Sequence, residues 1–115
     1  MLYYHVTSRE NVEPILKEGL FPGWGDLGFG VYLFNDVMAA LDYAGRSGWD
    51  GELVSPVVLE ISASADDVEP VIPHPDWPDP ETYENVVWYP AEEADLAWHP
   101  LHIRLMEDQT PFPDP

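Results

Sequence analysis

Two strand-like runs, each holding one polar side chain among aromatic and aliphatic neighbours, constrain this chain more than any other feature. The first is Leu2–Ser8, which carries His5, and the second is Gly28–Phe34, which carries Tyr32. Strands of this composition are usually buried on at least one face, where a hydrogen-bonding group is unfavourable unless it has a partner or a task. We therefore expect His5 and Tyr32 to contribute to one shared pocket.

A short helix is expected after the first strand, with a buried face made of Val12, Ile15 and Leu16. Thr7 and Glu10 have the spacing of a capping box, but a helix that starts there would hold Pro14 in its interior. If Asn11 is the cap, Pro14 falls in the first turn, where it is tolerated. In either case Gly19 is the expected left-handed stop.

Pro22 and four glycines predict a flexible loop over residues 21–30, followed by a strand over 31–34. Asn35 then stands where a helix cap is expected, and apolar residues at helical spacing continue to Gly45, the expected end. A polar loop is predicted over residues 46–52.

The second half of the chain is predicted to be mostly strands. Residues 57–61 are the clearest interior strand, and 86–89 and 101–106 are two more, joined by an acidic segment. Five prolines among acidic residues predict an extended surface excursion over 65–80, because proline lacks the amide hydrogen of a central strand.

This order of elements predicts a mixed α+β fold. A single domain over residues 1–106 with a loose tail over 107–115 suits a chain of 115 residues. Five Trp, six Tyr and four Phe supply the core, and the absence of cysteine excludes disulfides and thiolate metal sites.

Charge limits the partners. The chain has 22 acidic residues and a formal net charge of −18, against four basic residues: Arg9, Lys17, Arg46 and Arg104. Such a surface repels DNA and RNA. The acidity is explained either by a solvated surface, with or without salt adaptation, or by a partner with a basic face. We expect no membrane span and a cytoplasmic location, because there is no long apolar run and no basic leader.

No metal site is expected. His74, His99 and His102 supply three imidazoles, but their spacing matches no standard zinc pattern, and Pro100 disrupts helical geometry. No Walker loop, dinucleotide-binding glycine motif or serine elbow is present.

Taken in order over residues 2–44, the sequence resembles the His-Tyr-Glu class of ADP-ribosyltransferases, which includes diphtheria toxin and the poly(ADP-ribose) polymerases. The matching positions are His5, Thr7, Gly19, Leu20, Gly28, Gly30, Val31, Tyr32, Leu33, Ala40 and Tyr43. The resemblance implies a split β-sheet with two short helices and a nicotinamide cleft between the halves of the sheet.

The resemblance also implies site residues for NAD. His5 would bond the adenosine ribose, Thr7 would fix the turn beneath it, Tyr32 would stack on nicotinamide, and Tyr43 would close the other face. The implied NAD-binding set is His5, Val6, Thr7, Arg9, Gly30, Tyr32 and Tyr43. Arg9 is the candidate cation for the pyrophosphate, together with backbone amides of residues 23–28.

The third catalytic member, beside His5 and Tyr32, is a carboxylate that stabilises the oxocarbenium-like transition state. We assign it to Glu84, because Glu84-Asn85-Val86-Val87 resembles the segment that opens the corresponding late strand. The alternatives are Glu92, Glu93 and Asp95.

The predicted function is an NAD-dependent mono-ADP-ribosyltransferase that modifies a macromolecule, a protein rather than a nucleic acid given the charge. RNA 2′-phosphotransferase activity is disfavoured, because four basic residues are too few to hold an RNA phosphate. The alternative is a non-catalytic acidic inhibitor or nucleic-acid mimic, which would engage a basic partner through residues 66–80.

Overall fold

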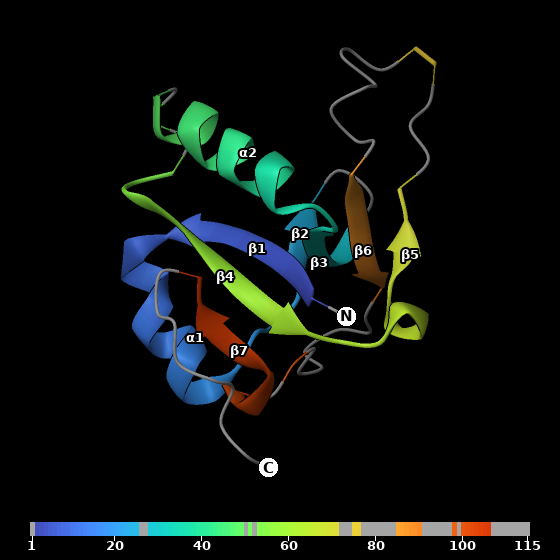
Figure 1. Ribbon diagram of the computed structural model, residues 1–115, viewed down its shortest axis with the longest axis horizontal. Helices are drawn as coiled ribbons and strands as arrows, with labels where there is room; N and C mark the ends of the chain where they lie inside the picture. The colour runs from blue at the N-terminus through green and yellow to red at the C-terminus, as the bar shows by residue number, and fades with distance from the viewer. Residues whose placement is uncertain are drawn as a thin grey trace.

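In the part of the chain that it describes, the computed structural model has two α-helices, α1 (Val12–Glu18) and α2 (Val37–Trp49), on opposite faces of one antiparallel sheet (Figure 1). The structure describes residues 2–25, 28–49, 51, 53–71, 75–76, 85–90, 98 and 100–106. Its strands are β1 (Leu2–Ser8), β2 (Gly23–Gly25), β3 (Gly28–Phe34), β4 (Pro56–Ser62), β5 (Glu69–Pro70), β6 (Val86–Pro90) and β7 (Ile103–Leu105). Three 3-10 turns are also described: η1 (Arg9–Asn11), η2 (Ala65–Asp67) and η4 (Pro100–His102). The predicted α+β class is confirmed.

The strand order is β5-β6-β3-β1-β4-β7, and β2 pairs with β3. Strands β1 and β4 are matched along their whole length, from Leu2 opposite Ser62 to Ser8 opposite Pro56. Strands β1 and β3, in contrast, are matched at one position, Tyr4 opposite Phe34. The sheet therefore consists of two halves, β1-β4-β7 and β2-β3-β6-β5, that meet at the junction of β1 with β3.

Each face of the sheet has its own apolar cluster. The cluster on the α1 face is built from Tyr3, Val12, Leu20, Val31, Leu33, Val57, Leu59, Ile61, Val87, Trp98 and Ile103. The cluster on the α2 face is smaller and contains Val6, Ala40, Ala44 and Val58. Alternation along β1, β3 and β4 divides their side chains between the two clusters, as expected of a sheet that is buried on both faces.

Helix α1 begins after Asn11, as the second of the two predicted caps requires. Asn11 occupies the N-cap position and Pro14 lies in the first turn, so the capping box of Thr7 and Glu10 is not formed. Asn11 does not cap the helix with its side chain; its Nδ2 donates to the Thr7 hydroxyl at 3.1 Å. Gly19 ends the helix where predicted, and its positive φ of 102° favours glycine, but its ψ of 179° differs from that of the expected left-handed helical conformation.

Three predictions in the first half of the chain are wrong. The glycine-rich stretch is not an open loop: Gly23 pairs with Gly30, and Gly25 pairs with Gly28, in a β2-β3 hairpin. The cap of α2 is Asp36 rather than Asn35, because the Asp36 carboxylate accepts the Ala39 amide at 3.1 Å.

Helix α2 also continues past Gly45 to Trp49, so residues 46–49 are helical rather than part of a polar loop. Glycine inside a helix costs only about 1 kcal/mol, and the buried Ser47 holds the last turns against the sheet. The Ser47 carbonyl accepts the Leu53 amide just after the helix end.

Strand β4 extends the expected 57–61 by one residue at each end, and β6 confirms the strand predicted over 86–89. The strand predicted over 101–106 is too long: β7 covers only Ile103–Leu105, because Leu101 and His102 belong to the 3-10 turn η4. The first part of the proline-rich segment is better ordered than predicted: Ser64 and Asp67 form a capping box on η2, and β5 pairs with β6. Pro70 is tolerated there because β5 is an edge strand. The tail over 107–115 lies outside the described residues.

Candidate functional site

His5 and the main chain of Tyr32 meet where the two halves of the sheet join. The imidazole Nδ1 of His5 lies 3.1 Å from the Tyr32 carbonyl oxygen. Tyr4, which is matched with Phe34 in the register of the two strands, immediately precedes His5 on β1. The His5 side chain therefore forms a hydrogen bond between β1 and β3 next to the position at which the two strands are paired.

This contact fixes the tautomer of His5. A carbonyl oxygen can only accept, so Nδ1 carries the hydrogen and donates it to Tyr32. Burial lowers the pKa of His5 below its ordinary value of 6.5, and the bond to the Tyr32 carbonyl opposes that effect in part. Neutral His5 therefore presents Nε2 as a hydrogen-bond acceptor.

The Tyr32 ring packs on a residue that sequence reasoning missed. Tyr32 and Trp88 are direct cross-strand partners on β3 and β6, and their rings are stacked with centroids 6.0 Å apart and planes 16° apart. A Cβ on Gly30 would lie 2.9 Å from the Trp88 ring and against the Tyr89 carbonyl. Glycine at position 30 thus makes room for Trp88. No local sequence signal pairs residues 32 and 88, because the pairing depends on the β3-β6 register.

The two central side chains leave the sheet on opposite faces. His5 is opposite Leu59 of the α1 face, whereas Tyr32 shares the α2 face with Phe34. Val6, the neighbour of His5, contributes to the α2 cluster on the same face as Tyr32. The structure thus brings His5 to the backbone of Tyr32, and a ligand reaching both side chains would have to occupy the junction itself.

Tyr43 reaches the same face of β3 from α2. Its ring lies against Phe34, with centroids 5.4 Å apart and planes tilted by 41°. Because Phe34 is two residues from Tyr32 on one face of the strand, Tyr32 and Tyr43 both border the α2 side of β3.

Thr7, Ser8 and Arg9 form the end of β1. Thr7 is buried and bonded to Asn11, and the Ser8 hydroxyl accepts the Val54 amide at 3.0 Å. The Arg9 amide donates to the Val54 carbonyl at 3.2 Å, while the residue itself is exposed. These hydrogen bonds fix the backbone at the end of β1. Arg9 lies at the surface there, four positions along the chain from His5.

The predicted third member, Glu84, and its alternatives Glu92, Glu93 and Asp95 lie outside the described residues. Asn85, which follows Glu84 in the sequence, accepts the Asn35 amide on its carbonyl at 2.9 Å. The start of β6 is thereby held beside the end of β3.

Metal ligands are sparse in the part of the chain that the structure describes, which contains no group of three or more His, Asp or Glu able to hold an ion. His74 and His99 are outside that part.

Among the described residues, none of the helices is both long and apolar enough to cross a bilayer.

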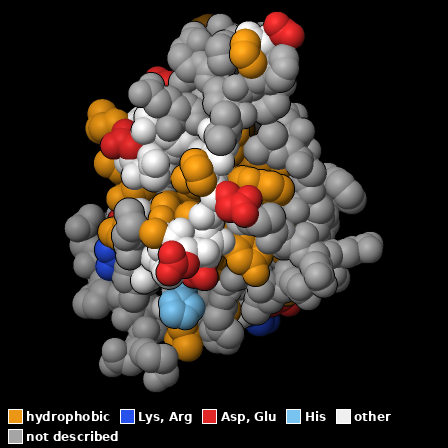
Figure 2. All heavy atoms as spheres, turned by 90° about the vertical axis from the view of Figure 1, so that its right-hand side faces the viewer, with side chains coloured by type: hydrophobic (Ala, Val, Ile, Leu, Met, Phe, Trp, Pro, Cys, Tyr) orange, Lys and Arg blue, Asp and Glu red, His pale blue; other side chains and the backbone are white. Residues whose placement is uncertain are grey.

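The acidic character of the sequence is visible on the surface. Figure 2 shows separate Asp and Glu side chains among apolar and uncharged ones on the side of the molecule that carries β5. Exposed acidic residues of this region include Asp66, Asp67 and Glu69.

Comparison of the chain with protein-family models, curated proteins and solved structures finds no match.

Proposed function

We propose that the chain is an NAD-dependent mono-ADP-ribosyltransferase with a split sheet of the kind expected for the His-Tyr-Glu class. The observation that carries the proposal is the bond from His5 Nδ1 to the Tyr32 carbonyl. It joins the two motif residues at the junction of the two sheet halves, where the class is expected to bind nicotinamide.

The state of His5 supports a binding role. Its lowered pKa keeps the imidazole neutral near pH 7, so Nε2 accepts a hydrogen bond from a ribose hydroxyl rather than acting as a cation. The Tyr32-Trp88 stack supplies an aromatic surface next to the junction, which suits a planar nicotinamide ring. Arg9 is the proposed cation for the pyrophosphate.

The proposed reaction breaks the bond between C1 of the nicotinamide ribose and the ring nitrogen, and the bonding electrons leave with neutral nicotinamide. A nucleophilic side chain of the target protein forms the new bond to C1 and loses its proton to solvent or a base. The proposed role of the Glu84 carboxylate is to stabilise the positive charge that develops on the ribose. The target is a protein in this proposal, because a net charge of −18 repels nucleic acid.

Binding of NAD tests the first step. We expect thermal stabilisation of the purified chain by millimolar NAD and saturable binding by calorimetry. His5→Asn is the informative variant, because the Asn amide group can still donate to the Tyr32 carbonyl but has no acceptor at the position of Nε2. We expect about tenfold weaker NAD binding in that variant with the fold retained. A folded wild-type chain that shows no response to millimolar NAD would refute the proposal.

Transfer is tested separately from binding. Glu84→Gln should bind NAD as the wild type does while releasing nicotinamide at least about a hundredfold more slowly. Glu13→Gln, at an exposed position on α1, is the matched control and should leave the rate unchanged. If Glu84→Gln keeps its rate, the same assay on Glu92→Gln, Glu93→Gln and Asp95→Asn identifies the carboxylate.

The second candidate, an acidic protein that engages a basic partner, is favoured by the net charge. It predicts that His5→Asn has no effect on function and that charge reversal at Asp66, Asp67 and Glu69 abolishes partner binding. High salt should weaken that binding steeply.

A further inference from the structure

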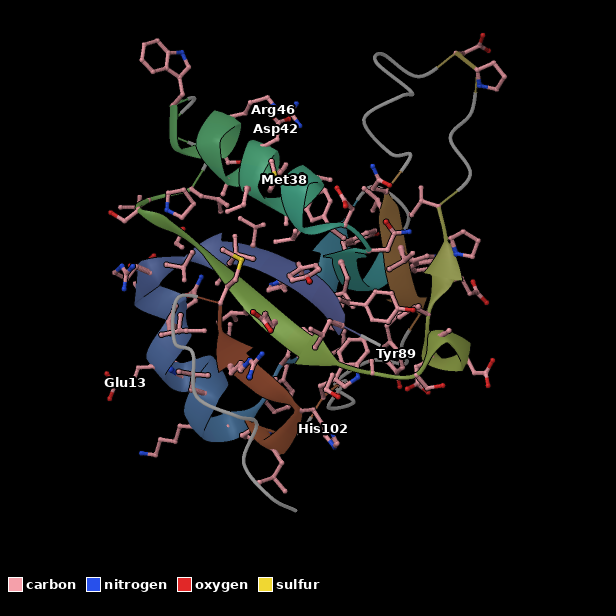
Figure 3. All side chains as sticks on the ribbon, viewed as in Figure 1. Glu13, Met38, Asp42, Arg46, Tyr89 and His102 are labelled. Atoms are coloured by element: carbon pink, nitrogen blue, oxygen red, sulfur yellow. The ribbon has the colours of Figure 1, made fainter. Side chains whose placement is uncertain are left out.

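Helix α2 has apolar side chains on the face that points away from the sheet. Its inner face is small and buried, with Ala40, Ala44 and Ser47. Its outer face exposes Met38 by 67%, Leu41 by 40% and Trp49 by 91%. Figure 3 shows Asp42 and Arg46 on the side of α2 remote from the strands. Met38, Leu41 and Trp49 belong to neither apolar cluster of the sheet.

The outer apolar residues lie along one stripe. Residues 38, 45 and 49 recur at intervals of seven and four positions, which align on an α-helix of 3.6 residues per turn. Leu41 lies at the edge of the same stripe. Isolated exposed apolar residues are ordinary, but exposed apolar side chains gathered on one helix face, with a Trp among them, mark an interaction surface. The charged Asp42 and Arg46 lie on this face between Met38 and Trp49.

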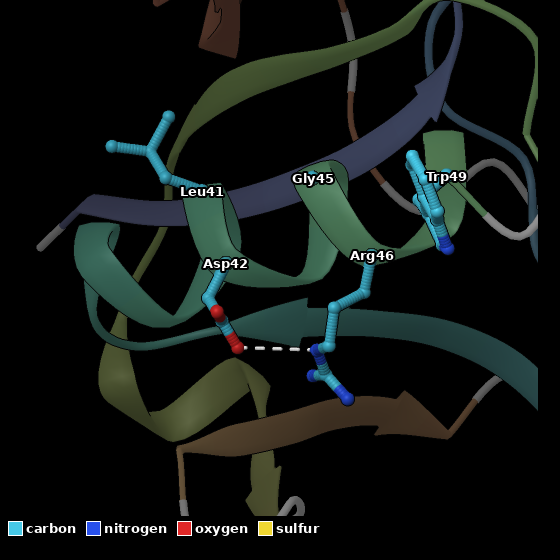
Figure 4. Close-up of a pocket in the computed structure, with 5 residues that line it drawn as sticks. All are labelled: Leu41, Asp42, Gly45, Arg46 and Trp49. Carbon is cyan, nitrogen blue, oxygen red and sulfur yellow. Dashed lines mark ion pairs between the residues drawn. The ribbon is translucent and has the colours of Figure 1, made fainter.

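The stripe contains a hollow. Figure 4 shows the residues that line this open depression: Leu41, Asp42, Gly45, Arg46 and Trp49. Its volume is about 480 Å³. Gly45 is one of its lining residues, and a Cβ at that position would have no atom within 4 Å. Leu41 and Trp49 stand on either side of Gly45 along the helix. Such a hollow accepts an apolar side chain from a second helix, as in ridge-into-groove packing.

Charge selects the occupant. The Asp42 carboxylate and the Arg46 guanidinium form an exposed ion pair at 3.1 Å beside the hollow. Asp36 is also exposed, at the start of α2. With a net charge of −18, the chain repels a second copy of itself, nucleic acid and anionic lipid surfaces. A positively charged partner is attracted instead.

We infer that the outer face of α2 is a docking surface for a cationic amphipathic helix of another protein. One apolar side chain of that helix occupies the hollow over Gly45, its apolar face covers Met38 and Trp49, and its Lys or Arg residues face the acidic surroundings. This surface contains none of the residues proposed to bind NAD, so the inference does not depend on the enzymatic proposal.

The test uses a labelled peptide of about 15 residues made of Leu and Lys in an amphipathic helical pattern, and its analogue with Glu in place of Lys. Binding is measured by fluorescence anisotropy to the wild-type chain and to Leu41→Ser and Trp49→Ser. Phe21→Ser is the matched control, because Phe21 is a 53% exposed apolar residue outside α2. Circular dichroism checks that each variant is folded.

We expect the Lys peptide to bind the wild type and Phe21→Ser equally, and Leu41→Ser and Trp49→Ser at least about tenfold more weakly. The Glu peptide should not bind. Equal binding of the Lys peptide to all four chains would show unspecific charge attraction and overturn the inference, as would absence of binding to the wild type. A wild-type dimer in sedimentation analysis that Trp49→Ser dissociates would also overturn it, in favour of a second copy as the occupant.

Discussion

The Glu60 carboxylate accepts two hydrogen bonds from the Arg104 guanidinium, at 2.8 Å from Nη2 and 3.1 Å from Nε. The two residues are direct cross-strand partners on β4 and β7. Their side chains are only 12% and 24% exposed, so this ion pair is better shielded from water than an ordinary surface pair. It ties the three-residue strand β7 to the sheet.

Replacing Arg104 with Met should lower the free energy of unfolding by about 2 kcal/mol, because it leaves the Glu60 charge poorly solvated and without this partner. Glu60→Leu should relieve that penalty. We therefore expect the double variant to be more stable than the sum of the single effects predicts, by about 1 kcal/mol in urea unfolding. If the changes in the free energy of unfolding of the two single variants simply added up in the double variant, Glu60 and Arg104 would not be energetically coupled.

The lowered pKa of His5 predicts a specific pH dependence of stability. Between the ordinary pKa of 6.5 and the lower folded-state pKa, the unfolded chain binds a proton at His5 that the folded chain does not. Stability from this group is therefore present above pH 6.5 and is lost as the pH falls, by at most about 1.4 kcal/mol per pH unit.

His5→Asn removes this contribution. Urea unfolding at pH 7.5 and pH 5.5 should show a larger loss on acidification for the wild type than for the variant. The carboxylates are common to both chains, so their titration cancels in the comparison. An identical pH dependence of the two chains would mean that His5 titrates normally.

Ser47→Ala should stabilise the fold. The Ser47 hydroxyl is buried in α2 and has no hydrogen-bond partner among the residues that the structure describes, and alanine also has the higher helix propensity. We expect a gain of about 1 kcal/mol in the free energy of unfolding. Ser8→Ala is the matched control: Ser8 is also buried, but its hydroxyl accepts the Val54 amide, so this variant should lose about 1 kcal/mol. If both variants were stabilised, burial of the hydroxyl alone, and not the lack of a hydrogen-bond partner, would determine the change in the free energy of unfolding.

Two glycines should respond to alanine in opposite directions. Gly45→Ala adds a methyl group to open space on a helix and should stabilise the fold by about 0.5–1 kcal/mol. Gly30→Ala places a methyl group against the Trp88 ring and the Tyr89 carbonyl and should destabilise it by about 1–3 kcal/mol. Thermal and urea unfolding would check both, and a neutral Gly30→Ala would show that β3 and β6 separate easily.

The local sequence pattern was sufficient to predict those elements whose residues all favour the same secondary structure. Strand β4 has a run of β-branched and aliphatic residues, and α1 has three apolar residues on one face with Gly19 as its end, so both were predictable. Helix α2 was predicted too short, because Gly45 is a terminator by propensity alone. The burial of Ser47 against the sheet, a tertiary contact, carries the helix past it.

The candidate site was predictable only as a set of residue types. The sequence placed His5 and Tyr32 in strands, but the contact between them depends on β1 and β3 becoming neighbours with a single matched position. Trp88 was missed because its place beside Tyr32 follows from the register of β6, which no local spacing encodes. The assignment of Glu84 stays a prediction.

The position of β1 in the sheet has a consequence for how the chain folds. Strand β1 lies between β3 and β4, and its fully matched partner, β4, comes only after the whole of α1, β2, β3 and α2 in the chain. Its backbone hydrogen bonds therefore require closure of a long intervening loop. Pairing of this kind is non-local and slows folding, and until β4 is available the apolar residues of Leu2–Ser8 are exposed to other chains.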